Sequence, residues 1–181
     1  MVYLFLANGF EEIEALAPVD FLRRSGVEIK TVGVSGKMCC GAHNISVEAD
    51  ILIDDIVLDS NLDGIILPGG MPGADNLDKS SKVQSAIDYC VQNGKIVSAI
   101  CAAPFILGKK GVLNGKKATC FPGFEEHLQG ATVLPDGVVT DGNIITARGA
   151  GVAWEFGAAI ATALVGEEKS KGILSAIQWK K

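Results

Sequence analysis

Cys101 is the residue of this 181-residue chain whose surroundings point most directly to chemistry. It follows an apolar, strand-like run at residues 95–100, and Ala102, Ala103 and Pro104 then open a helical pattern. Small residues there mirror the Gly-x-Ser-x-Gly turn that presents a nucleophile between a strand and a helix. Backbone N–H groups and the positive end of a helix would favour the thiolate, so we expect a lowered pKa. The alternative is a buried structural cysteine.

A pair of glycines supplies the second candidate. Gly69 and Gly70 end the apolar run at residues 63–68, inside a segment rich in turn-forming residues. Consecutive glycines allow backbone N–H groups to converge as an anion-binding nest or an oxyanion hole. No Gly-Lys-Ser/Thr follows, which excludes a phosphate-binding P-loop. A simple tight turn is the alternative interpretation.

Three acidic residues open the first helical pattern. Glu11 and Glu12 are expected there, because the helix dipole favours acidic residues in a first turn. Glu14 lies further along, near the spacing of the buried side. A buried carboxyl has a raised pKa and, when protonated, can donate a hydrogen bond to a thiolate. Glu14 is therefore a candidate proton carrier.

Arg148 and the two histidines complete the set of candidates. Arg148 follows an apolar run and precedes a glycine-rich turn at residues 149–151, with a surface ion pair as the alternative. His43 lies in a polar loop, and His127 lies in a segment at residues 124–127 that we expect to form an exposed helical turn. We expect both imidazoles to be solvated.

The cysteine pattern indicates reduced thiols. Five cysteines stand at positions 39, 40, 90, 101 and 120, an odd number without a Cys-x-x-Cys motif or a disulfide framework. Cys39 and Cys40 lie near His43, but adjacent cysteines bind one metal poorly and no second ligand pair exists. We therefore expect no metal site.

Composition and charge exclude several classes of protein. Hydrophobic residues make up 48% of the chain and charged residues 20%, which excludes a disordered chain. The net charge of −5 comes without a basic cluster, so we expect no nucleic-acid partner. No apolar stretch reaches membrane-spanning length, and no basic segment precedes the first apolar run. We expect no membrane contact, no signal peptide and a cytoplasmic location.

Alternating apolar runs and helical patterns predict how these residues are positioned. Strands are expected at residues 2–7, 27–34, 63–68 and 95–100, a hairpin at 138–147 around Asp141-Gly142, and helices at 11–25, 80–93 and 151–164. Strands separated by helices indicate a mainly parallel sheet covered on both faces, in a single domain over residues 1–181. Ligands of such sheets bind beyond the carboxyl ends of the strands. We expect the segments after residues 7, 68 and 100 to converge there.

Five segments together resemble the ThiJ/PfpI family, in its parkinsonism-associated deglycase branch. They are residues 7–14 (Ala-Asn-Gly-Phe-Glu-Glu-Ile-Glu), 18–20, 67–70 (Leu-Pro-Gly-Gly), 99–102 (Ala-Ile-Cys-Ala) and 146–149 (Thr-Ala-Arg-Gly). The resemblance covers nearly the whole chain. It implies a flavodoxin-like three-layer α/β/α sandwich, similar to the class I glutamine amidotransferases, and a homodimer.

The resemblance also implies roles for individual residues. Cys101 matches the family nucleophile, which oxidises readily to a sulfinate, and Glu14 matches the acidic residue that hydrogen-bonds its sulfur. Gly69, Gly70 and Ala102 match positions whose backbone N–H groups line the site. In the same way, Arg148 matches an arginine near the pocket mouth.

Two departures from family patterns bear on mechanism. The protease-like branch carries His directly after the nucleophile, where Ala102 stands here, which argues against a peptidase or amidase. Some deglycase members carry a pocket histidine that would align near Phe121. Without it, Glu14 must carry more of the proton transfer. Cys120, next to that position, could be a second thiol at the pocket.

Two functions remain open on these residues. The resemblance implies a cofactor-independent glyoxalase or deglycase, acting on small reactive carbonyls such as methylglyoxal and on early glycation adducts. The alternative is an oxidative-stress sensor or redox-regulated chaperone that works through oxidation of Cys101. Both require the same reactive thiol.

Overall fold

Seven strands form one sheet in the order β10-β11-β7-β6-β1-β2-β5 in the computed structural model, which describes residues 1–180. Neighbouring strands are parallel except β10 and β11, which form an antiparallel hairpin. The strands are β1 (Val2–Leu6), β2 (Ile29–Gly33), β5 (Ile51–Leu52), β6 (Gly64–Leu67), β7 (Ile96–Ile100), β10 (Val138–Asp141) and β11 (Ile144–Ala147). The prediction of a mainly parallel sheet is confirmed.

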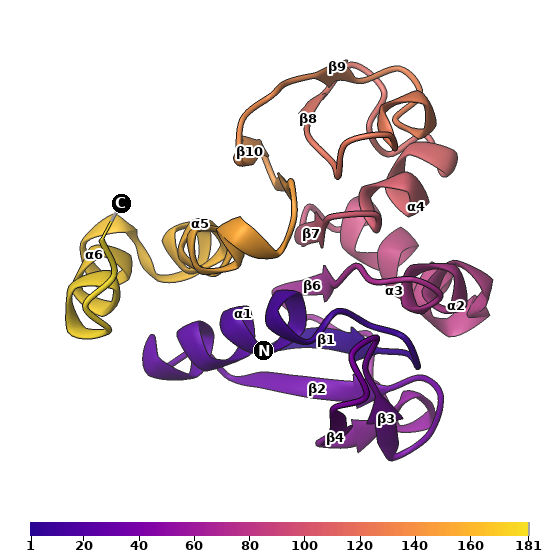
Figure 1. Ribbon diagram of the computed structural model, residues 1–181, viewed down its shortest axis with the longest axis horizontal. Coiled ribbons are helices and arrows are strands. Elements are labelled where there is room, and N and C mark those ends of the chain that lie inside the picture. Colours follow the sequence, from indigo (N-terminus) through magenta and orange to yellow (C-terminus); the bar gives the residue numbers. More distant parts are fainter. Residues whose placement is uncertain (181) are drawn as a thin grey trace.

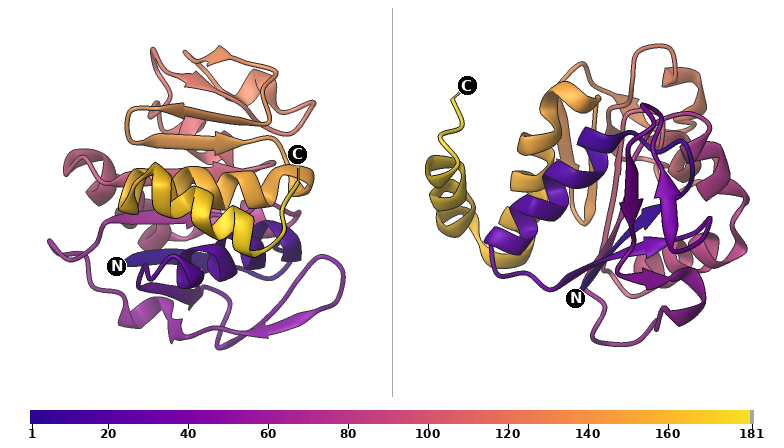
Figure 2. Two further views of the ribbon diagram at one scale, coloured as in Figure 1. Left: turned by 90° about the vertical axis from the view of Figure 1, so that its left-hand side faces the viewer. Right: turned by 60° about the horizontal axis from the view of Figure 1, so that its bottom comes forward.

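Helices cover both faces of this sheet, as Figure 1 shows. They are α1 (Glu12–Arg24), α2 (Gly73–Lys79), α3 (Ser81–Gln92), α4 (Pro104–Lys109), α5 (Ala153–Val165) and α6 (Glu167–Ala176). Helices α1 and α5 pack on one face, and α2, α3 and α4 on the other. Helix α6 lies outside α5, away from the sheet (Figure 2). The result is the predicted three-layer sandwich.

Two buried clusters, one on each face, explain why β1 is apolar throughout. In β1, Leu4 and Leu6 point to the layer of α1 and α5, whereas Tyr3 and Phe5 point to the layer of α2, α3 and α4. Successive side chains of a strand face opposite sides, so a strand covered on both sides must be apolar at every position. These four side chains are at most 2% exposed.

Several short elements were not predicted. A small antiparallel hairpin pairs β3 (Met38–Cys40) with β4 (Ser46–Glu48), and β8 (Lys117–Ala118) pairs in parallel with β9 (Thr132–Val133). Single turns of 3-10 helix lie at Ile53–Asp55 (η1), Glu125–His127 (η2) and Ala150–Val152 (η3). Helices α2 and α6 were also missed, whereas α4 begins where the helical pattern after Cys101 predicts, and η2 coincides with the helical turn expected at residues 124–127. Among residues 1–180, no helix combines the length and apolar composition needed to cross a membrane.

The order of the strands decides where the site lies. Strands β11, β7, β6 and β1 are neighbours and run parallel, so their carboxyl ends share one edge. Cys101 directly follows β7, Gly69 and Gly70 follow β6, and the segment leading to Glu14 follows β1. Arg148 follows β11. The predicted convergence of these segments is confirmed.

Candidate active site

Cys101 occupies a strained turn between β7 and α4. Its φ is +65°, in the left-handed region that costs a residue with a side chain roughly 1–2 kcal/mol. The turn is held by two backbone bonds: Cys101 N–H donates to Ala147 O at 2.9 Å, and Phe121 N–H donates to Cys101 O at 2.8 Å. The side chain is half-buried. The structure therefore contains the tight strand-to-helix turn that the sequence predicts.

Glu14 lies beside this turn, buried to 1% exposure. Its Oε2 accepts a hydrogen bond of 3.0 Å from Gly69 N–H. A Cβ atom added at Gly69 would lie 2.5 Å from Glu14 Oε2 and 2.6 Å from Cys101 Cβ. The Glu14 carboxyl and the Cys101 side chain therefore flank one small space, which only glycine leaves open between them.

Burial raises the pKa of Glu14 from 4.5 to about 7. The charge of Glu11 adds to this rise, whereas the Cys101 thiol and the N–H groups of Gly69 and Ala150 oppose it. Near neutral pH the carboxyl is consequently close to half protonated. Glu14 can both accept and release a proton there, as an acid–base group requires.

The expected lowering of the Cys101 pKa is wrong. Burial raises this pKa to about 12, and the charge and hydrogen bond of Glu14 raise it further than the N–H groups of Ala102 and Gly70 lower it. Burial likewise raises the pKa of Cys90 to about 12 and that of Cys120 to about 11.

What separates Cys101 from these structural thiols is the neighbouring acid. When Glu14 is ionised, its charge opposes the thiolate; when Glu14 is protonated, that opposition disappears and an O–H donor faces the sulfur. The two groups therefore titrate as a pair, and the thiolate forms mainly while the proton resides on Glu14. We expect reactivity to follow the first proton lost by this pair, near the pKa of Glu14, rather than the ordinary thiol pKa.

The three backbone N–H groups expected to line the site divide into two roles. Those of Gly70 and Ala102 act on the Cys101 sulfur. That of Gly69 is engaged by Glu14 Oε2, so it positions the carboxyl and is not free for a substrate oxyanion. Gly70 has φ +83°, and a side chain there would collide with Glu11 N. The expected three-donor oxyanion hole is thus reduced to two donors.

Phe121 and Arg148 lie at the rim of this region. Phe121 is 47% exposed, and a Cβ at Gly149 would lie 3.4 Å from its ring and 3.9 Å from Glu14 Oε1. Arg148 donates to Pro135 O at 3.0 Å. The two side chains border one open, mostly apolar hollow, and Arg148 also borders a smaller one of about 260 Å³. Cys120 lines that smaller hollow.

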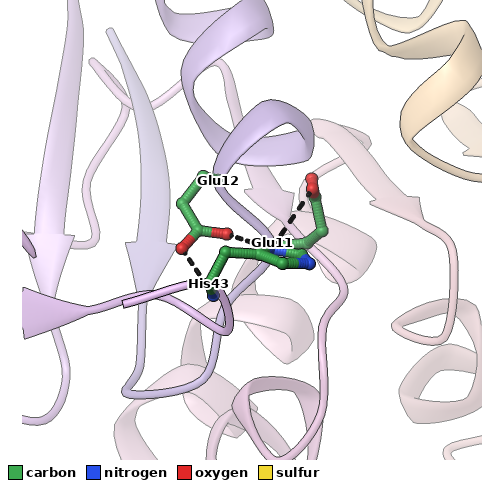
Figure 3. Close-up of side chains that lie close together, drawn as sticks. All are labelled: Glu11, Glu12 and His43. Carbon is green, nitrogen blue, oxygen red and sulfur yellow. Dashed lines mark hydrogen bonds and ion pairs between the residues drawn. The ribbon is translucent and has the colours of Figure 1, made fainter. Parts of the chain in front are cut away.

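The sequence did not reveal a buried contact between Glu12 and His43. Glu12 is 4% exposed and accepts 2.8 Å bonds from both the backbone N–H and the Nδ1 of His43 (Figure 3). The ring is exposed, as predicted, but it is held by this carboxylate rather than simply solvated. The contact ties the loop between β3 and β4 to the start of α1. No local pattern could predict it, because the two residues are 31 positions apart.

Metal binding is not the natural use of this cluster. Glu11, Glu12 and His43 bring ligand-type atoms within 4.8 Å of one another. However, Glu11 Oε2 accepts from Glu14 N–H, and both Glu12 oxygens accept from His43. These bonds account for the cluster without an ion, and we assign no metal to it. The geometry offers instead a thiol, a carboxyl that titrates near neutrality and two N–H donors.

Comparison with known proteins places this site in a family context. Residues 1–163 match the sequence model of the DJ-1/PfpI family. DJ-1 homolog B of Arabidopsis thaliana is 38% identical over 172 residues, which cover 93% of this chain and 39% of the relative. The chain therefore spans about two fifths of that relative's length. A protein of Pyrococcus horikoshii named a deglycase is 34% identical over 151 residues, covering 82% of this chain and 90% of that protein.

A solved structure agrees with the fold over nearly its full length. Oxidized DJ-1 of Toxoplasma gondii superposes with a TM-score of 0.94 at 31% identity, covering 99% of this chain and 98% of that one.

Proposed function

Because this chain belongs to the DJ-1/PfpI family, as the motifs around Glu14 and Cys101 predicted, we propose that it is a cysteine-dependent, cofactor-independent glyoxalase and deglycase. The observation that carries the proposal is the pair itself. A carboxyl whose pKa lies at about 7 faces a half-buried thiol on a strained turn. The substrates would be 2-oxoaldehydes such as methylglyoxal, and early glycation adducts.

The first step forms a bond between sulfur and carbon. The Cys101 thiol proton passes to Glu14, and the thiolate attacks the aldehyde carbon of the 2-oxoaldehyde. The carbonyl electron pair moves to oxygen, which the N–H groups of Gly70 and Ala102 would stabilise until Glu14 returns the proton to that oxygen and is ionised again. The product is a hemithioacetal.

Proton transfer between two carbons follows. Ionised Glu14 removes the hydrogen from the carbon bound to sulfur, giving an enediolate whose charge lies on the oxygen of the neighbouring carbon. That oxygen takes the hydroxyl proton of the first carbon, and Glu14 returns its own proton to the neighbouring carbon. This converts the hemithioacetal into a thioester of the 2-hydroxy acid. Water then cleaves the thioester, releasing the hydroxy acid and the free thiol. The overall reaction adds one water and requires no external oxidant or reductant.

Glu14 must supply both halves of this transfer, because Phe121 stands where an imidazole would otherwise assist. A pKa near the working pH suits a group that acts alternately as acid and base. Removal of early glycation adducts would use the same nucleophile on the carbon attached to the modified side chain. The naming of a relative as a deglycase supports this extension.

The test is turnover of methylglyoxal by purified protein and two variants. Cys101→Ala should abolish lactate formation while the far-UV circular dichroism stays unchanged. Cys40→Ala, which removes another half-buried thiol, should retain activity and serves as the matched control. Wild-type turnover in Cys101→Ala would overturn the proposal.

A redox sensor is the second candidate function. Cys39, Cys90 and Cys120 are buried; of the two partly exposed thiols, Cys101 faces N–H groups that could bind sulfinate oxygens, whereas Cys40 faces the carbonyl oxygen of Gly41. Titration with peroxide should then add two oxygen atoms to Cys101 before any other thiol, as measured by peptide mass. We further propose, from the family resemblance, that the protein acts as a cytoplasmic homodimer.

A further inference from the structure

Glu11 holds an unusual position between the helix that carries Glu14 and the turn that carries Gly69. Its side chain caps α1: Oε2 accepts a hydrogen bond of 2.7 Å from Glu14 N–H. Its backbone N–H donates to Gly69 O at 2.9 Å. Gly69 N–H in turn donates to Glu14 Oε2. Glu11, Gly69 and Glu14 therefore form a closed set of contacts around the carboxyl.

This cap is not what helix propensity alone would select. Ser, Thr, Asp and Asn are the preferred N-cap residues, because their short side chains reach the free N–H groups easily. Glutamate can do the same only with a longer and more mobile side chain. Its use here brings a negative charge close to Glu14, and that charge is one of the causes of the raised Glu14 pKa.

His43 stands on the other side of Glu11. Its Nδ1 lies 4.0 Å from Glu11 Oε1 and 2.8 Å from Glu12 Oε2, so the imidazole faces both carboxylates (Figure 3). The Glu12 contacts raise the pKa of His43. The titratable groups around the Glu14 carboxyl are thus Cys101 from the turn after β7 and Glu11 from its own helix, with Glu12 and His43 beyond Glu11.

We infer that Glu11 is a positioning residue for the proposed reaction: it orients the Glu14 carboxyl toward Cys101, and its negative charge helps to keep a proton on that carboxyl. The backbone contacts set the direction of the side chain, and the charge sets its protonation. The role of Glu11 in catalysis rests on the proposed function, but its effect on the reactivity of the Cys101 thiol does not.

Two substitutions separate orientation from charge. Glu11→Gln keeps an oxygen that can accept from Glu14 N–H but removes the negative charge. Without that charge Glu14 loses its proton more easily, so the first deprotonation of the pair moves to lower pH. Because ionised Glu14 opposes the thiolate, we expect the inflection of the alkylation profile to move to lower pH and the plateau rate above it to fall about two- to threefold relative to the wild type. Glu11→Ala removes the hydrogen bond to Glu14 N–H as well, and should lower the plateau rate further than Glu11→Gln does.

The measurement is the rate of Cys101 alkylation by iodoacetamide from pH 5 to pH 9, followed by the mass of the Cys101 peptide from the full-length protein. Glu168→Gln is the matched control, because it removes an acidic residue from the first turn of a different helix, α6. Its profile should equal that of the wild type. Glu11→Asp keeps the charge and a capping oxygen, so it should preserve the wild-type inflection and guards against a folding defect in the other variants.

Two results would overturn the inference: a Glu11→Gln profile identical to that of the wild type, or an equal shift in Glu168→Gln. A shifted profile in a protein that does not turn over methylglyoxal would instead reject the proposed function and leave the role of Glu11 standing. The alkylation assay therefore distinguishes the two failures.

Discussion

Glu14→Gln should remove a pH dependence from the stability of this protein. In the folded state burial holds the pKa of Glu14 at about 7, whereas an unfolded chain has its ordinary value of 4.5. Between these values the folded protein keeps a proton that the unfolded chain has lost. The favourable contribution of this group is therefore complete below pH 4.5, decreases as the pH rises and is gone above pH 7.

The size of the effect follows from the difference between the two pKa values. At about 1.4 kcal/mol per pH unit, the wild type should lose about 3 kcal/mol of unfolding free energy from this group between pH 4.5 and pH 8. Glu14→Gln has no ionisable group there and keeps an oxygen to accept from Gly69 N–H. Relative to the wild type, the unfolding free energy of the variant should therefore rise by about 3 kcal/mol from pH 4.5 to pH 8.

Urea unfolding at a series of pH values provides the assay. With a slope of about 1–3 kcal/mol per molar urea, the midpoint of the variant should move by about 1 M or more relative to the wild type. Protein concentration must be fixed, because a dimer would make stability depend on it. Parallel midpoint curves for the two proteins would show that Glu14 is not held in its protonated form by burial, and would refute this reasoning.

Two further substitutions test the geometry of the turn. Gly69→Ala would place a Cβ 2.5 Å from Glu14 Oε2 and 2.6 Å from Cys101 Cβ; we expect a loss of about 1–3 kcal/mol in urea unfolding and slower alkylation of Cys101, whereas Gly151→Ala, where a Cβ meets nothing within 4 Å, should change neither. The Cys101→Gly variant should be about 1 kcal/mol more stable to urea than the Cys101→Ala variant, because glycine adopts φ +65° without strain. A Cys101→Ala variant that is at least as stable as Cys101→Gly would contradict this.

The central part of the fold could be predicted because its signals are local. Apolar runs at the positions of β1, β6 and β7 differ from the structure by only one or two residues, and Cys101 follows its strand as expected. The rule that ligands bind beyond the carboxyl ends of parallel strands then predicted that Glu14 and Cys101 lie at one edge of the sheet. The match with the DJ-1/PfpI family confirms the resemblance that these motifs indicated.

What could not be predicted depends on contacts between distant segments. The hairpin of β3 and β4 consists of three-residue strands with little periodicity, and it is held to α1 by Glu12 and His43. The direction in which the pKa of Cys101 shifts depends on burial and on the charge of Glu14, and a turn motif in the sequence reveals neither of them. The engagement of Gly69 by Glu14 likewise follows only from the assembled structure.

The adjacency of β1, β6 and β7 gives the thiol a second use, as a reporter of cooperative unfolding. Each of these strands leads into one group of the site: Glu14 follows β1, Gly70 follows β6 and Cys101 follows β7. Separating any of these strands from its neighbour therefore disturbs the surroundings of the thiol. Fraying of α6, which lies at the outside of the molecule (Figure 2), leaves the surroundings of the thiol unchanged. The labelling rate of folded Cys101 would therefore not respond to fraying of the periphery, but it would change whenever the middle of the sheet opens.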